Sequence, residues 1–311
     1  MKKTLIATTA LIGLWAGPAL AETIGVSIPA ATHGWAGALN YHANRTIERL
    51  REANPDLTFV LTTTSDPSQQ VSDLEDMVAT RNIDALVVLP FESEPLTPPI
   101  QRIADSGIWV TVVDRGLTQD GIENLYVAGD NASFGRTAGE YFAETLEDGA
   151  KIVVMRGIAS TVDNERVEGF QAALEGSGIE VLAMDHANWN RDTAFSLMQD
   201  YLSRFPEIDA VWAADDDQAV GALNAIEQAG RSGEMIVVGG AGMKEMVARI
   251  RDNDAVVPVN VTYPPSMIST AIEMTVLGVT GAAPMSGEFI IASELITPDN
   301  ADNYYFEDSP Y

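Results

Sequence analysis

Residues 108–115, Ile-Trp-Val-Thr-Val-Val-Asp-Arg, join a short β-branched apolar run to an acid and a base. The same arrangement recurs at 210–217, where Ala-Val-Trp-Ala-Ala precedes three aspartates. Two more apolar runs, 24–28 and 179–182, lead to the polar and aromatic side chains His33, Trp35, Asp185 and Trp189. Open parallel sheets bind ligands beyond the carboxyl ends of their strands. The repetition therefore predicts one ligand site shared by several strand ends, with strand termination and helix capping as the alternative.

Similar apolar runs alternate with helical segments along the chain. They lie at 57–61, 85–89, 108–113, 152–155, 181–183, 210–214 and 236–238. Asp66 and Pro67 form a helix N-cap followed by proline at the first helical position, and Val71, Leu74 and Val78 then share one helix face. Strands that alternate with helices indicate βαβ units and parallel sheets. A chain of 311 residues is long enough for two such domains.

The first 21 residues have the composition of an export signal. Lys2 and Lys3 precede an uncharged stretch, and Ala19-Leu20-Ala21 has the small-x-small form that signal peptidases cut. A membrane anchor is the alternative, but Gly17-Pro18 interrupts the apolar stretch, which is shorter than the roughly 20 residues of a spanning helix. We therefore expect a signal peptide at 1–21 and a mature protein that lies free in a bacterial periplasm.

The composition excludes several classes of site. The chain has no cysteine, and therefore no disulfide, thiolate metal site, cysteine nucleophile or lipidated cysteine. A formal net charge of −27 repels nucleic acid and anionic lipid. Because the acids are spread along the chain, we interpret them as a solvated surface, with attraction of a cationic ligand as the alternative. His33 has no i, i+4 relation to His42 or His186, so no metal site is expected.

The aspartates at 215–217 permit two interpretations. Adjacent carboxylates suit a metal site or a two-carboxylate hydrolase. An apolar helix face follows from Ala219 to Ile226, however, so the acids would also cap that helix and complement its dipole. Nothing in the spacing indicates a general acid whose pKa is separated from that of a partner. We favour capping, and a periplasmic glycoside hydrolase that uses Asp215 or its neighbours is the alternative function.

A sugar or sugar alcohol presents hydroxyl groups and a patch of C–H surface. Carboxylates and arginines match the hydroxyls, because hydrogen bonds to charged groups contribute about 1.5 to 3 kcal/mol. Aromatic rings match the C–H patch through apolar burial. The side chains that supply both kinds of group are Asp114, Arg115, Arg166, Asp215, Trp35 and Trp189.

Each of these residues also has a purely structural interpretation. Asp114 and Arg115 would form a local ion pair at a hinge, and Arg166 would lie on a helix surface. The two tryptophans would pack in a core. Trp35 has the stronger binding claim, because the glycines beside it are typical of an exposed loop.

Three motifs occur in a specific order. Val113-Asp114-Arg115 ends one strand and Gly129-Asp130-Asn131 follows another, while 156–160 leads into a segment at 164–170. With these motifs the chain resembles, from about Thr23 to Ile291, the periplasmic sugar-binding proteins of ABC importers, of the ribose-, galactose- and arabinose-binding type. The segment at 164–170 looks like that family's Arg-x-x-Gly-Phe element, with Arg166 as the ligand arginine.

The resemblance implies an α/β fold of two doubly wound parallel-sheet lobes joined by a three-crossing hinge, the type I periplasmic binding protein fold. It implies an amino-terminal lobe of 22–128 with 263–292 and a carboxy-terminal lobe of 129–262 with 293–311. The implied ligand-binding residues are His33, Trp35, Asp114, Arg115, Arg166, Trp189, Asp215 and Tyr263.

The implied function is capture of a neutral monosaccharide or sugar alcohol by hinge closure and its delivery to an ABC permease, by a monomer without enzymatic activity or cofactor. Two departures from the family are visible: Gly239-Gly240-Ala241-Gly242 replaces a Gly-Phe-Asp-Gly ligand turn, and Asp215 replaces a frequent asparagine. The hydroxyl pattern is therefore expected to differ from that of ribose. The related lactose-repressor family is excluded, because the chain lacks a basic DNA-binding head and begins with a signal peptide.

Overall fold

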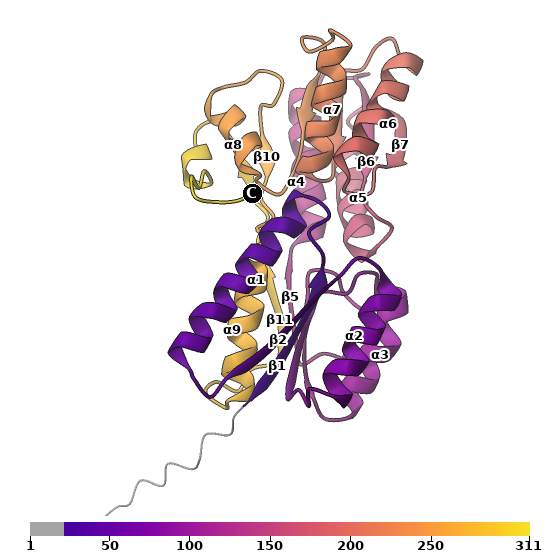
Figure 1. Cartoon of the computed structure of the whole chain (residues 1–311). Coiled ribbons are helices and arrows are strands. Elements are labelled where there is room, and N and C mark those ends of the chain that lie inside the picture. Colours follow the sequence, from indigo (N-terminus) through magenta and orange to yellow (C-terminus); the bar gives the residue numbers. More distant parts are fainter. Residues whose placement is uncertain (1–21) are drawn as a thin grey trace, which may run out of the picture.

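The computed structural model of the chain describes residues 22–311, so the expected signal peptide lies outside the described residues. The described chain forms two α/β lobes, one above the other, and each is built on a parallel sheet (Figure 1). The predicted fold class is confirmed. Between residues 22 and 311, no helix combines the length and the apolar character that crossing a membrane requires.

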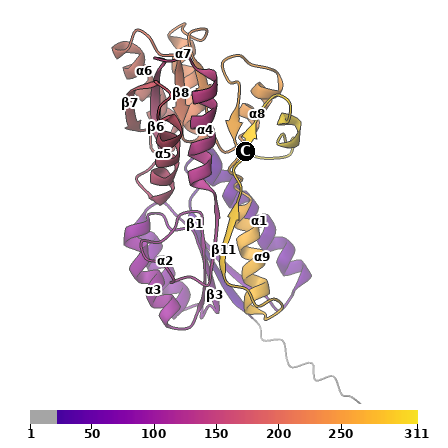
Figure 2. The ribbon, with the colours of Figure 1, turned by 180° about the vertical axis from the view of Figure 1, so that it is seen from behind.

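A six-stranded parallel sheet in the order β11-β5-β4-β3-β1-β2 forms the first lobe. Its strands are β1 (Thr23–Pro29), β2 (Thr58–Thr64), β3 (Ala85–Val88), β4 (Trp109–Val113), β5 (Leu125–Gly129) and β11 (Gly287–Ile291). Its helices are α1 (Gly34–Ala53), α2 (Pro67–Ala79), α3 (Ser93–Asp105) and α9 (Met267–Val279). The pair α1 and α9 covers one face, and the pair α2 and α3 covers the other (Figures 1 and 2). Strand β3 is buried along its whole length, as its continuous apolar sequence predicts.

The second lobe is built on a four-stranded parallel sheet in the order β7-β6-β8-β9. Its strands are β6 (Lys151–Arg156), β7 (Glu180–His186), β8 (Ala210–Ala213) and β9 (Ile236–Val238). Its helices are α4 (Asn131–Thr145), α5 (Thr161–Leu174), α6 (Arg191–Arg204), α7 (Asp216–Gln228) and α8 (Lys244–Arg251). The fully buried Trp212 of β8 stacks on Phe170 of α5, with ring centroids 4.0 Å apart.

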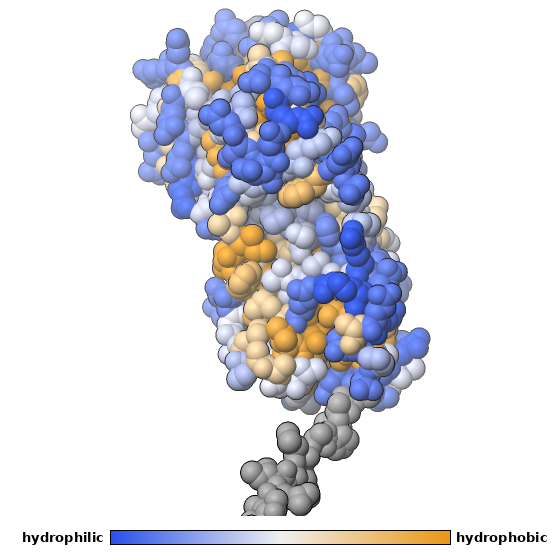
Figure 3. Space-filling model, turned by 90° about the vertical axis from the view of Figure 1, so that its left-hand side faces the viewer, coloured by the Kyte–Doolittle hydropathy of each residue, from blue (hydrophilic) through white to orange (hydrophobic). Residues whose placement is uncertain are grey.

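Three connections join the two lobes: β5 to α4, β10 to α9, and β11 to β12. The short strands β10 (Asn260–Val261) and β12 (Leu295–Ile296) pair antiparallel, and the 3₁₀ helix η1 (Ala301–Asn303) follows them. The molecule narrows at this junction, and hydrophobic patches are more extensive on the lobe of α1 and α9 than on the other in the view of Figure 3. The junction therefore has the form of a hinge between two compact bodies.

Two local expectations have different outcomes. Asp66 accepts a hydrogen bond from the Gln69 backbone N–H, which confirms the predicted N-cap of α2. The expectation that Trp35 lies in an exposed loop is wrong, because α1 begins at Gly34 and Trp35 belongs to its first turn, where it is 9% exposed.

Candidate ligand-binding cleft

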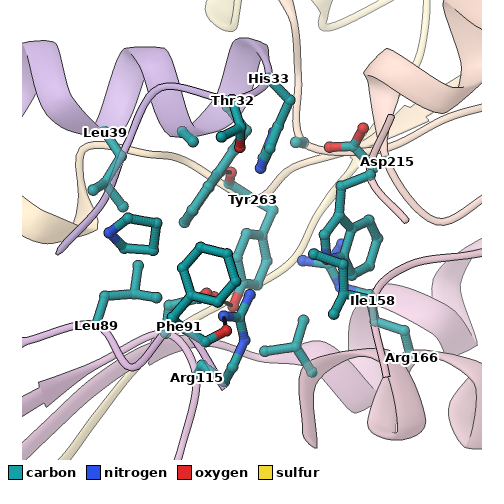
Figure 4. A pocket seen from close by; sticks show the side chains of 17 residues that line it. Thr32, His33, Leu39, Leu89, Phe91, Arg115, Ile158, Arg166, Asp215 and Tyr263 are labelled. Carbon is teal, nitrogen blue, oxygen red and sulfur yellow. Dashed lines mark hydrogen bonds between the residues drawn. The ribbon is translucent and has the colours of Figure 1, made fainter. Parts of the chain in front are cut away.

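All eight residues predicted to bind a ligand line a single cleft between the lobes (Figure 4). They reach it from the segments that follow β1, β4, β7, β8 and β10, and from helix α5. The other residues of the lining are Pro29, Thr32, Ala36, Leu39, Leu89, Phe91, Ile158, Val162 and Ala241. The structure thus brings the predicted set together, and the role of each residue in binding stays a prediction.

Asp114 and Arg115 directly follow β4 and line the cleft. The Asp114 carboxylate accepts a hydrogen bond from the Tyr263 hydroxyl, which the connection from β10 to α9 carries. Arg115 Nη1 donates to the carbonyl oxygens of Pro90, at 2.8 Å, and of Phe91. Burial raises the pKa of Asp114, and the nearby Arg115 opposes that shift. Asp114 is therefore bonded to the hinge tyrosine, while Arg115 fixes the loop after β3.

Arg166 projects from α5 and is 4% exposed. Its Nε donates to Asn131 Oδ1 at 2.9 Å, and its Nη1 donates to the Ala214 carbonyl at 2.6 Å. The guanidinium carbon lies 4.1 Å from the centroid of the Phe134 ring and 4.3 Å from that of Tyr263. A surface position for Arg166 is therefore wrong.

The aspartates 215–217 lie at the N-terminus of α7. Asp215 is the N-cap and accepts from the backbone N–H groups of Asp217 and Gln218, at 2.8 and 3.3 Å. Asp216 accepts from Met243 N and Asn260 Nδ2, at 2.7 and 2.6 Å. The predicted capping role is confirmed for Asp215, and Asp216 and Asp217 lie in the first turn of α7. Burial, followed by the charges of the two neighbouring aspartates, raises the pKa of Asp215 well above its ordinary value.

Asp217 links the second lobe to the first. Its Oδ2 accepts from the backbone N–H of Gly34 at 2.6 Å, and its Oδ1 accepts from Arg191 Nη2 at 3.0 Å. The nearby His33 Nδ1 lies 3.9 Å from Asp217 Oδ2. Burial lowers the pKa of His33 to about 4, although the Asp217 charge opposes the shift, so the imidazole is neutral at neutral pH.

One group of side chains has the composition of a cation site. Ligating atoms of His33, Asp215 and Asp217 lie within 4.8 Å of one another. Both Asp217 oxygens and one Asp215 oxygen already accept hydrogen bonds from N–H groups, however. Three of the four carboxylate oxygens are therefore accounted for by contacts within the protein, and the absence of a metal stays a prediction.

Aromatic side chains form much of the remaining lining. The Trp35 indole N–H donates to the Tyr263 carbonyl at 3.0 Å, and Trp35 stacks on His33 with ring planes 13° apart. Trp189 lies against Gly157, where a Cβ atom would come within 1.8 Å of the indole ring. Position 157 must therefore be glycine for Trp189 to take this position.

Three residues of the lining have backbone conformations that only glycine adopts easily. The φ angles of Asp114, Trp189 and Ala241 are +60°, +55° and +105°. Such angles are disfavoured for residues with a Cβ, and they are concentrated at functional sites. The turn at 239–242, which stands where the resemblance implies a Gly-Phe-Asp-Gly turn, therefore supplies a strained residue, Ala241, to the cleft.

Sequence reasoning missed Phe91 and misplaced Asp185. Phe91 follows the apolar run 85–89 and lies beside Arg115 in the cleft (Figure 4). The same strand-end pattern that identified Asp114 would have found it. Asp185 lies in β7 and accepts a hydrogen bond from the Tyr201 hydroxyl at 2.9 Å, so it has a structural role outside the cleft lining.

The family model for the periplasmic binding protein domain matches residues 24–282. The chain belongs to this family. The ribose import binding protein of Escherichia coli (strain K12) is 30% identical over 241 residues, which are 76% of this chain and 79% of that protein. The resemblance found in the sequence motifs is confirmed.

Solved structures of the family have the same fold. An ABC transporter solute binding protein from Mycobacterium smegmatis with bound glycerol is 26% identical, with a TM-score of 0.82 over 93% of this chain and 98% of that chain. A solute binding protein from Bacillus halodurans C-125 with bound myo-inositol has a TM-score of 0.84 and 24% identity, over 95% of this chain and 100% of that one. At that identity the second likeness concerns the fold alone.

Proposed function

We propose that the cleft binds a neutral monosaccharide or sugar alcohol. The observation that carries the proposal is its lining, in which carboxylates and guanidinium groups alternate with the aromatic surfaces of Trp35, Phe91 and Trp189. The buried Nε of Arg115 has no partner among residues 22–311, so it is available to donate to a ligand hydroxyl. The E. coli relative is named for ribose, and the M. smegmatis structure holds glycerol, which are both neutral polyhydroxylated molecules.

The rest of the function follows from the family. The lobes, 22–128 with 263–292 and 129–262 with 293–311, close over the ligand about the three connections, and the closed monomer delivers it to an ABC permease. Periplasmic binding proteins are themselves a standard example of hinge closure around a ligand, so closure is taken from the family. Export directed by residues 1–21 brings the protein to the periplasm.

The protein binds its ligand without converting it. Asp216 and Asp217 accept hydrogen bonds within the protein with both carboxylate oxygens, and Asp215 is engaged as the α7 N-cap through Oδ1, so these three aspartates offer no pair of free carboxylates to act as acid and base at a glycosidic bond. We therefore expect no turnover of chromogenic glycosides. Steady hydrolysis that Asp215→Asn abolished would replace this proposal with the hydrolase.

A thermal-shift screen tests the proposal. The panel contains D-ribose, glycerol and other pentoses, hexoses and sugar alcohols, with amino acids and sugar phosphates as negative controls. A ligand at about 100 times its Kd stabilises the folded protein by about 2.7 kcal/mol, which raises Tm by roughly 5 °C or more. Stabilisation by an amino acid or an anion alone would overturn the proposal.

A further inference from the structure

The C-terminal tail, residues 297–311, is attached to the second lobe. Lys244 Nζ, at the start of α8, donates to the carbonyl oxygens of Glu307 and Ser309, at 3.1 and 2.7 Å. The Arg251 guanidinium, at the end of α8, lies 4.1 Å from the centroid of the Tyr305 ring. The tail then returns to the junction of the lobes, where the C-terminus lies next to α8 and the start of α1 (Figures 1 and 2). Tyr311 is thus attached to the second lobe through the tail and lies next to the first lobe.

Tyr311 contacts the first lobe at Gly34. The tyrosine is 6% exposed. A Cβ atom at Gly34 would lie 3.1 and 3.2 Å from two Tyr311 ring carbons and 2.8 Å from Asp217 Oδ2. Gly34 also donates its N–H to that same Asp217 oxygen. The Tyr311 ring, Gly34 and the Asp217 carboxylate therefore meet at one point, outside the three connections of the hinge.

The hydroxyl of Tyr311 is neutral at this point. Burial and the charges of Asp215, Asp216 and Asp217 raise the phenol pKa well above its ordinary value. The hydroxyl has no hydrogen-bond partner among residues 22–311. The contact with Gly34 is made by ring carbons, so the tyrosine acts here through apolar packing of its ring.

We infer that Tyr311 is a positioning residue of the cleft: its ring packs against Gly34 when the lobes are together and thereby holds the contact between Gly34 and Asp217. His33 and Trp35, on either side of Gly34, line the cleft, so the contact fixes the first-lobe wall against Asp215. Opening of the hinge would separate Gly34 from Tyr311 and expose the ring. The inference rests on the proposed function, because it assigns Tyr311 to the closed, ligand-holding form.

The test compares variants of the full mature chain. Tyr311→Ala removes the ring, Tyr311→Phe removes only the hydroxyl, and Phe306→Ala removes a 63% exposed aromatic ring from the same tail as a matched control. The probe is D-ribose, or the member of the neutral panel that raises the wild-type Tm most. Calorimetry gives Kd, stopped-flow fluorescence gives the dissociation rate, and melting curves without ligand report on folding.

We expect Tyr311→Ala to bind about tenfold more weakly, through faster dissociation, because the ring is buried only when the lobes are together. Tyr311→Phe and Phe306→Ala should bind within about twofold of the wild type. The ligand-free Tm should stay within about 2 °C for Tyr311→Phe and Phe306→Ala. Wild-type affinity in Tyr311→Ala, equal weakening by Phe306→Ala, or equal weakening by Tyr311→Phe would overturn the inference.

A double-mutant cycle tests the contact itself. Gly34→Ala adds a Cβ that the Tyr311 ring and Asp217 Oδ2 leave too little room for, so it should weaken binding in the wild type. In the Tyr311→Ala background the added methyl group still meets Asp217 Oδ2 but no longer meets the ring, so the same change should weaken binding less. Additive effects would overturn the inference.

A measurement without ligand separates this inference from the proposed function. If no member of the panel binds the wild type, the proposed function fails, and small-angle X-ray scattering still tests the contact. The ligand-free Tyr311→Ala protein should then have a larger radius of gyration than the wild type and Phe306→Ala. Equal radii for all three proteins in that case would overturn the inference.

Discussion

The two lobes present their arginines to the cleft in different ways. Arg166 of the second lobe lies within α5, and its guanidinium packs against the rings of Phe134 and Tyr263. Arg115 of the first lobe follows β4 and bonds to two carbonyls of the loop after β3. Both side chains are buried, but the second-lobe arginine packs against aromatic rings, whereas the first-lobe arginine is held by the carbonyls of a loop.

This difference indicates where stability and binding are coupled. A buried side chain with two hydrogen bonds and two aromatic neighbours contributes to folding as well as to binding. Side chains on the loops after β1 and β3 contribute chiefly to binding, because loops are less tightly packed than the elements they connect. Substitution of the buried Arg166 should therefore change Tm and Kd together, whereas substitution of the half-buried Phe91 should change chiefly Kd.

Arg166→Ala should have the largest effect. We expect binding of a neutral sugar to weaken by about 2 to 5 kcal/mol, or roughly thirtyfold to several thousandfold, because charge-assisted hydrogen bonds in a buried site are lost. The ligand-free Tm should also fall by roughly 5 °C or more, because Asn131 and the Ala214 carbonyl lose their partner. Calorimetry and melting curves measure the two effects.

The control for this substitution is Arg136→Ala, which removes an arginine whose side chain is 52% exposed on α4. This substitution should change neither the affinity for the sugar nor the ligand-free Tm measurably. If Arg166→Ala lowered Tm and left the affinity unchanged, Arg166 would have a structural role alone, and the proposed contact with the ligand would be wrong at that position.

His33, which lies in the first-lobe wall of the cleft, should make the free energy of unfolding depend on pH. Its pKa is about 4 in the folded protein, against 6.5 for an exposed histidine. Between these values the unfolded chain binds a proton that the folded protein excludes, so the free energy of unfolding falls as the pH is lowered. The loss reaches about 3 kcal/mol by pH ~4.

His33→Gln should remove this contribution. The raised pKa values of Asp215 and Asp216 act in the opposite direction in both proteins and are subtracted in the comparison. Urea denaturation at intervals from about pH 7.5 down to about pH 4 measures the difference. If the free energies of unfolding of the variant and the wild type changed in parallel with pH, the folded protein would protonate His33 as readily as the unfolded chain does, and the prediction would be wrong.

Phe91→Ala should have the smallest of these effects. Removal of its ring takes away apolar contact with the ligand, so binding should weaken by about 1 kcal/mol, or roughly fivefold. The ligand-free Tm should hardly change, because Phe91 is only half-buried. Phe289→Ala, at a 44% exposed position of β11, is the control. A fall in Tm comparable to that of Arg166→Ala would remove the distinction between the two walls.

The sequence could predict those charged residues of the site that lie at the ends of strands. Asp114, Arg115 and Asp215 closely follow buried apolar runs, and a parallel sheet brings such positions to one edge. Phe91 obeys the same rule and was missed because Pro90 separates it from its strand. The alternating apolar runs likewise predicted the two parallel sheets, because each run is long enough for only one strand.

The burial of Arg166 and the position of Tyr311 could not be predicted in this way. Arg166 is enclosed by rings from α4 and from the connection between β10 and α9, which meet α5 only in the folded chain. Tyr311 reaches Gly34, at the opposite end of the sequence, through the attachment of the tail to α8. No local pattern reports contacts between such distant segments.

A crystal structure of the complex would show whether the eight predicted residues form the ligand site. The ligand is D-ribose, or the member of the neutral panel that raises Tm most. We predict a ligand enclosed between Trp35 and Phe91 on one side and Trp189 on the other, with hydroxyls bonded to Asp114, Arg115, Arg166 and Asp215. A ligand outside this cleft, or one within it that contacts none of these four charged side chains, would refute the assignment of the site.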